Sequence, residues 1–117
     1  MKTFMALYLA PVTVLEQMMS KSTPEEREEG MAAWQAWNDA HEGDIVDMGK
    51  PLGKTKTVTG SGTKDTKNEI CGYTFVQADS HEEAADIFED HPHLTMMQGA
   101  TIDVLECIEM DDMAAMK

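Results

Sequence analysis

The sequence predicts a mixed α+β domain whose strands and helices follow the order βαββαβ. Two helix starts carry the capping-box pattern, in which a Ser or Thr is followed three residues later by Glu: Thr23 with Glu26, and Ser80 with Glu83. Apolar stretches typical of strands flank these helices, at residues 3–9, 72–78 and 101–109. This order is that of a split βαβ arrangement.

Length and composition indicate one domain. With 117 residues the chain has the size of a single folding unit, so residues 1–117 are expected to form one domain. Apolar residues make up 42%, which is enough for a core and too many for a disordered chain. The apolar start is too short for a membrane span and reads better as a strand than as a signal peptide. We therefore expect a cytoplasmic protein.

The net charge of −13 disfavours nucleic acid and anionic membranes as partners. The charge is uneven, because residues 50–67 hold five Lys and one Asp, a net +4, and the rest of the chain therefore carries −17. Two interpretations of this basic segment stay open. It is a solvated hairpin that turns at residues 60–62, or a basic flap over an anionic ligand.

The first strand has no polar face. Its side chains divide into Phe4, Ala6 and Tyr8 on one side and Met5, Leu7 and Leu9 on the other. A sheet with helices on one face only should alternate apolar and polar residues instead. A second copy of the chain is the simplest cover for the second face, so we expect a homodimer.

Two helical segments are expected after this strand. Residues 11–20 hold apolar side chains at helical spacing and predict one or two turns. The main helix begins at Thr23, has Pro24 at its first position, and runs to about His41. Gly30 lies on the apolar stripe of this helix, which predicts close contact with the sheet.

The second half of the chain predicts extended segments at residues 44–52 and 54–59, then the strand at 72–78. The helix that starts at Ser80 is expected to end just before Pro92.

In the last strand Ile102 and Val104 face away from Asp103, which would point to a second subunit or a cavity if the apolar pair meets the helices. Cys71 and Cys107 fall in strands that are not neighbours in this topology, so we expect free thiols.

Several passages carry a family resemblance. They are the opening strand, the helix-to-strand passage at 37–52, the acidic–x–Lys–x–Glu–x–x–Gly–Tyr passage at 65–73, the helix start at 82–84 and the closing strand at 99–104. In these the chain resembles the YCII-related family, including its branch named for a DGPF tetrapeptide, over nearly its whole length. The resemblance implies a ferredoxin-like fold that pairs into a dimeric α+β barrel.

Two departures bear on catalysis. Residues 62–65 read Gly-Thr-Lys-Asp where the DGPF tetrapeptide is expected. A better-studied branch of the family places a His in the first long helix and pairs it with an Asp in the following strand, and here Gly30 stands near the position of that His. The dyad is therefore not carried over. His93, His41 and Asp103 are instead the candidates for acid–base catalysis.

His91 and His93 bracket Pro92 at the predicted end of a helix. No third His or Cys completes a metal-ligand set nearby, so no metal site is expected. His91 either caps the helix C-terminus, where a cation is favourable, or contributes to a ligand site. His93 is a candidate acid or base, because imidazole titrates near neutral pH.

Aromatic residues supply candidate ligand contacts. Trp34 and Trp37 share a helix stripe with His41, and they belong either to the core or to the wall of a small-molecule pocket. Tyr8 and Tyr73 are core or interface residues, or ligand-binding hydroxyls. Asp103 is either a carboxylate in water or, if partly desolvated, a general base.

Two functions from different classes remain open. One is a cofactor-free enzyme that uses His and Asp for acid–base chemistry on a small molecule. The other is a non-catalytic dimer that binds a small molecule or has a regulatory role. The sequence contains no phosphate loop and no dinucleotide fingerprint, so no cofactor is expected.

Overall fold

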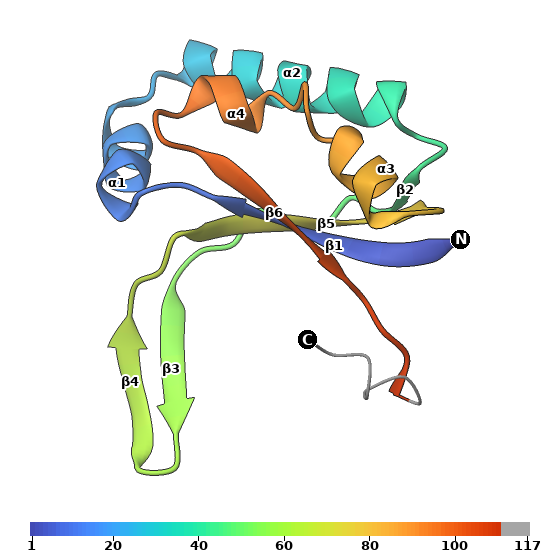
Figure 1. Ribbon diagram of the computed structural model, residues 1–117. Helices are drawn as coiled ribbons and strands as arrows, with labels where there is room; N and C mark the ends of the chain where they lie inside the picture. Colours follow the sequence, from blue (N-terminus) through green and yellow to red (C-terminus); the bar gives the residue numbers. More distant parts are fainter. Residues whose placement is uncertain (111–117) are drawn as a thin grey trace.

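A four-stranded antiparallel sheet with helices over one face forms the body of the molecule (Figure 1). A computed structural model describes residues 1–110. The strands of the sheet are β1 (Lys2–Leu9), β2 (Ile45–Asp47), β5 (Ile70–Ala78) and β6 (Thr101–Glu106), in the order β2-β5-β1-β6. The helices are α1 (Val12–Lys21), α2 (Pro24–Ala40), α3 (His81–Asp86) and α4 (His93–Met96). The predicted ferredoxin-like βαββαβ arrangement is confirmed, with a hairpin added between β2 and β5.

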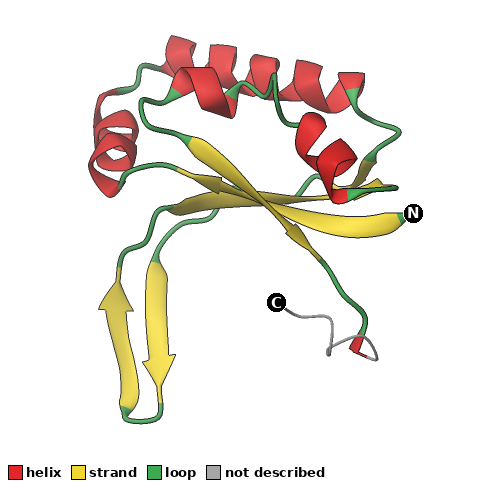
Figure 2. Cartoon of the chain, in the orientation of Figure 1, coloured by secondary structure: helices red, strands yellow, loops and turns green. Residues whose placement is uncertain are grey.

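The core lies between the sheet and the helices. The inward side chains of β1 and β5 alternate with half-buried ones, as the period of two requires. Phe4, Ala6 and Val76 are fully buried in this layer. Met5 and Leu7 are half-buried on the opposite face, which none of the helices in the described part of the chain covers (Figure 2). The absence of a polar face on the first strand therefore leaves an apolar surface open on this single chain.

Helix α2 starts and ends close to the predicted positions. Thr23 accepts a hydrogen bond from the backbone N–H of Glu26, while the Glu26 carboxylate accepts one from the backbone N–H of Thr23. One detail differs from prediction. Buried Gly30 makes its close approach to Met96 of α4 rather than to the sheet, since a Cβ built at Gly30 would lie 2.7 Å from Met96 Cε.

The segments around the two His residues correct the sequence prediction. Helix α3 ends at Asp86 instead of running on to Pro92, and residues 87–90 form turns. The backbone then makes the short α4, which was not predicted. Helix α1 has 10 residues and is longer than expected, whereas β6 ends at Glu106, before the predicted end at residue 109.

The basic segment forms a separate two-stranded hairpin of β3 (Thr55–Thr59) and β4 (Gly62–Thr66). This hairpin projects from the side of the sheet opposite the helices (Figure 1). Lys56 and Asp65 stand opposite each other across it, with Nζ and Oδ1 2.6 Å apart. The prediction of a hairpin is confirmed, and of the extended segment predicted at 44–52 only β2 and an isolated bridge at Pro51 pair with the sheet.

The cysteines are free and separated by β1 as predicted, but Cys107 lies past the end of its strand rather than within it. Cys71 lies on β5 and Cys107 just beyond β6, with β1 between these two strands, and both thiols are free. Within residues 1–110, no helix has the length and apolar character needed to cross a membrane.

Candidate functional site

Five aromatic side chains from three parts of the chain meet under the helices, and we call them the imidazole cluster: Tyr8, Trp34, Trp37, His91 and His93. Tyr8 is placed by the inward register of β1, and the two Trp side chains by their one-turn spacing on α2. His91 is the centre of the group. Its ring centroid lies 4.4 Å from those of Trp34 and Trp37 and 4.8 Å from that of Tyr8.

Hydrogen bonds to the backbone fix the tautomers of both imidazoles. The backbone N–H of His93 donates to Nδ1 of His91 across 3.0 Å, so the neutral His91 ring carries its proton on Nε2. His93 Nε2 lies 2.9 Å from the carbonyl oxygen of Leu9. Because a carbonyl only accepts, Nε2 of His93 carries the proton and Nδ1 keeps its lone pair.

Three polar atoms of the cluster are buried and have no hydrogen-bond partner within residues 1–110: Trp37 Nε1, His91 Nε2 and His93 Nδ1. Both His side chains have 0% exposure. An unpaired buried polar group costs about 1–3 kcal/mol, so native folds rarely keep several together. With these tautomers, Trp37 Nε1 and His91 Nε2 are unpaired N–H donors, and His93 Nδ1 is an unpaired acceptor.

Burial also decides the charge state of the site. Desolvation lowers the pKa of His91 to about 3, with His93 and His41 acting in the same direction and Asp90 opposing them. Burial lowers the pKa of His93 as well, against the raising effect of the Leu9 and Thr101 carbonyls. Both imidazoles are therefore neutral near pH 7. Burial raises the pKa of Tyr8 to about 12, despite the lowering effect of its hydrogen bond with Thr74.

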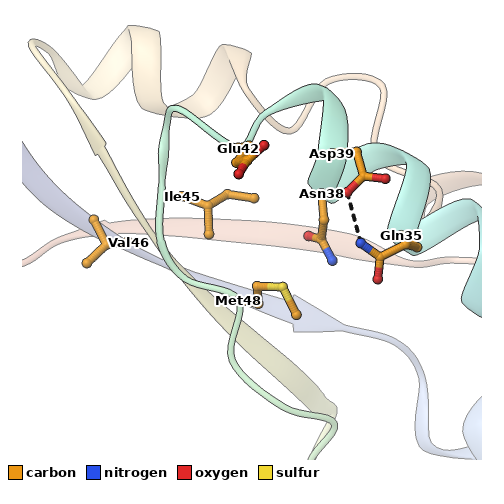
Figure 3. Close-up of a pocket in the computed structure, with 7 residues that line it drawn as sticks. All are labelled: Gln35, Asn38, Asp39, Glu42, Ile45, Val46 and Met48. Atoms are coloured by element: carbon orange, nitrogen blue, oxygen red, sulfur yellow. Dashed lines mark hydrogen bonds between the residues drawn. The ribbon is translucent and has the colours of Figure 1, made fainter.

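A hydrogen-bond relay leads from the cluster to an open groove. Thr74 Oγ1 donates to the backbone oxygen of Met48 at 2.9 Å, so its lone pair accepts the hydroxyl proton of Tyr8 at 2.6 Å. The groove has a volume of about 360 Å³ between α2 and the β2 segment. It is lined by Gln35, Asn38, Asp39, Glu42, Ile45, Val46 and Met48 (Figure 3). Figure 3 shows the Asn38 amide pointing from α2 towards Met48 across this groove.

The other sequence candidates lie outside the cluster. His41 stacks its ring 4.8 Å from that of Trp37, and its Nε2 lies 3.7 Å from Asp90 Oδ1, so it stands at the cluster edge. Asp103 is exposed on the open face of the sheet, opposite Leu7 of β1. Tyr73 points to that same face and packs against Phe75, with ring centroids 5.8 Å apart.

The structure also corrects one interpretation and adds one residue. His91 does not cap the end of a helix, since α3 stops five residues before it and its ring is buried. Thr74 was missed, although a hydroxyl on the inward face of an otherwise apolar strand is a signal for a buried hydrogen bond. Within residues 1–110, no group of three or more His, Cys, Asp or Glu side chains could hold a metal ion.

The antiparallel sheet with helices on one face and a His-rich core defines an α+β protein of ferredoxin-like topology. Residues 1–110 match the family model described as the YCII-related domain, so the chain belongs to this family. No curated protein matches the sequence as a relative.

A solved structure with a similar fold is 5-chloro-2-hydroxyhydroquinone dehydrochlorinase (TftG) from Burkholderia phenoliruptrix AC1100, in complex with 2,5-dihydroxybenzoquinone. The TM-score is 0.51 and the sequences are 16% identical, over 86% of this chain and 90% of that chain. At this identity the likeness concerns the fold.

Proposed function

We propose that the protein is a cofactor-free enzyme that moves a proton on a small, planar, oxygen-bearing molecule within the imidazole cluster. The observation that carries the proposal is the set of three unpaired polar atoms on the buried side chains of Trp37, His91 and His93. Two N–H donors suit a substrate oxygen, and one free lone pair suits an acidic proton beside it. Flat aromatic walls suit a flat ligand.

The tautomers assign a role to each group. His93 Nδ1 is the proton acceptor, because its lone pair is free and the ring is neutral near pH 7. His91 Nε2–H and Trp37 Nε1–H are hydrogen-bond donors that stabilise negative charge growing on the substrate oxygen. With a pKa of about 3, His91 stays neutral and donates without giving up a full proton.

The groove beside α2 is the proposed entry for the ligand. It meets the cluster through Met48, whose backbone oxygen is held by Thr74 beneath Tyr8. Asn38 and Gln35 supply amides along this route. The similarity of the fold to an enzyme named for a chlorinated hydroxyhydroquinone supports an aromatic, oxygen-bearing substrate class.

A homodimer is part of the proposal. The face of the sheet without helices carries apolar side chains, including Leu105 with 44% exposure, and a second copy would bury them. Asp103 and Tyr73 lie on this face, so in the dimer they belong to the subunit interface or to a second cavity rather than to the imidazole cluster.

Binding and exchange experiments test the enzyme proposal. The probe is 2,5-dihydroxybenzoquinone, with calorimetry for binding and NMR in D₂O for exchange of its ring protons. We expect Trp37→Phe to weaken binding about tenfold, because a donor is lost while the aromatic surface remains. We expect His93→Gln to slow exchange more than binding, because it removes the base. The control is His81→Asn, whose exposed ring lies outside the cluster. Wild-type exchange rates in His93→Gln would contradict the role of the base.

A non-catalytic ligand-binding or regulatory dimer is the second candidate. The position of Asp103 favours it, because this carboxylate lies on the opposite face of the sheet from His93, so within a single subunit the two side chains do not pair. Probe binding that depends on Trp37 and His91, without ring-proton exchange above that of free buffer, would select this function over the enzyme.

A further inference from the structure

We propose that the basic arm, residues 50–67, clasps the acidic helical surface of the second copy in the homodimer, with the start of α2 as its docking point. The inference rests on the homodimer included in the proposed function. It concerns the hairpin, which the proposed chemistry does not use.

Charge complementarity selects a second copy as the occupant. The arm carries +4 and the rest of the same chain −17, so each copy offers both the basic and the acidic surface. Some arm charges are already neutralised: Lys56 pairs with Asp65, and Lys67 pairs with Glu16 at the base of the arm. Lys54 and Lys64 are exposed and have no carboxylate within 4.0 Å in the described part of the chain.

The start of α2 is a dense group of carboxylates on the body, formed by Glu25, Glu26, Glu28 and Glu29. All four are exposed. Arg27 stands among them, but its guanidinium donates to the backbone oxygen of Ser22 rather than to a carboxylate. Clustered like charges of this kind are stabilised by an approaching cation.

The reach of the arm fits this contact. The hairpin leaves the sheet on the side away from its own helices, which is the side of the open apolar face (Figure 1). Stacked sheets lie about 10 Å apart, and a five-residue strand spans about 17 Å. An arm of this length passes the edge of the partner's sheet and arrives beside the helices on its far side.

The base of the arm also has a receptive shape. A groove of about 320 Å³ lies there. It is lined by Leu52, Gly53, Lys54, Thr55, Lys56, Asn68 and Ile70. Leu52 and Ile70 supply apolar lining beside the Lys54 ammonium, which suits the aliphatic stem and carboxylate of a Glu side chain.

Charge reversal followed by mixing tests the contact in the full chain. The arm variant is Lys54→Glu/Lys64→Glu, and the helix variant is Glu28→Lys/Glu29→Lys. The control is Lys2→Glu/Lys21→Glu, which changes the net charge as the arm variant does but lies outside the arm. Dimer dissociation constants are measured by sedimentation at about 50 mM and about 500 mM salt, with circular dichroism to verify folding.

We expect each of the two reversed variants to dimerise about tenfold more weakly at low salt, with the difference shrinking at high salt. An equimolar mixture of the two should recover dimerisation, because in the mixed dimer both arm-to-helix contacts are attractive again. The control should dimerise about as wild type does.

The outcomes separate the two proposals. If the wild-type protein dimerises and the reversed variants do so equally tightly, or if mixing restores nothing, the arm contact is wrong and the homodimer stands. If the wild type is a monomer at micromolar concentration, both the homodimer and the arm contact are wrong. The ligand-binding test of the imidazole cluster is independent of both results.

Discussion

The backbone N–H of His93 donates to Nδ1 of His91 across 3.0 Å, and both rings are fully buried. This contact across two residues explains how the chain keeps an imidazole in its core without charging it. Pro92 between them supplies no N–H of its own, so the turn presents the N–H of His93 alone to the ring. The proton of His91 is thereby held on Nε2.

Acid should destabilise the fold through His91. Its pKa is about 3 in the folded protein and about 6.5 when unfolded, so the unfolded chain binds the extra proton between these values. Above pH 6.5 the protonation of His91 does not affect stability. As the pH falls below this value the free energy of unfolding decreases, by about 3 kcal/mol at pH 4. His93 acts in the same direction.

Replacing His91 by Asn tests this assignment, because the Asn side-chain oxygen can still accept from the N–H of His93. Urea unfolding between pH 7 and pH 4 should give a curve for His91→Asn that lacks about one proton of pH dependence relative to wild type. Parallel curves for the two proteins would show that His91 is not the titrating group.

The relay from Tyr8 through Thr74 to Met48 predicts unequal effects of two conservative changes. Thr74→Val strands the buried Tyr8 hydroxyl and removes a donor from the Met48 carbonyl, so we expect a loss of about 1–3 kcal/mol in the free energy of unfolding. Tyr8→Phe leaves the Thr74 donor bond intact and should cost about 0.5–1.5 kcal/mol. Chemical denaturation measures both.

The double variant sharpens this test. Tyr8→Phe removes the hydroxyl that Thr74→Val strands, so the combined loss should be smaller than the sum of the two single losses. Strict additivity would mean that the two hydroxyls do not depend on each other.

Gly49 should tolerate no side chain. Its φ is +73°, and an added Cβ would lie 1.8 Å from the backbone oxygen of Tyr73, where the neighbour is too rigid to move aside. We expect Gly49→Ala to lower the free energy of unfolding by about 3 kcal/mol or more. Gly43→Ala is the matched control, since no atom of the described residues lies within 4 Å of its added Cβ. Similar melting temperatures for the two variants would rule out this account.

Local chemistry explains what could be predicted from the sequence. The capping box at Thr23 involves groups three residues apart, and it sets the start of α2 as expected. The end of α3, in contrast, depends on a competition between continuing the helix and burying side chains that follow it. Asp86, Glu89 and Asp90 oppose the negative end of a helix dipole, while Phe88 and His91 are drawn into the core, so the helix stops early. The acidic residues were visible in the sequence, but the pull of the core was not.

Long-range pairing explains most other differences. Strand β6 ends at Glu106, which pairs with Phe4 near the start of β1, and one further bond joins the N–H of Cys107 to the carbonyl oxygen of Thr3. The imidazole cluster joins residues up to 85 positions apart in the sequence, from Tyr8 to His93. Each of its members was a candidate from its own local pattern, yet only the packing of α2 over β1 brings them together. The side of the sheet taken by Asp103 followed from strand alternation alone.

Both tryptophans of the chain place their rings 4.4 Å from His91, and the sequence holds no others. All indole emission of the protein therefore originates at the imidazole cluster. Intrinsic fluorescence consequently records occupancy of the cluster, protonation of its histidines and loss of its packing directly, without a label or background from a distant tryptophan.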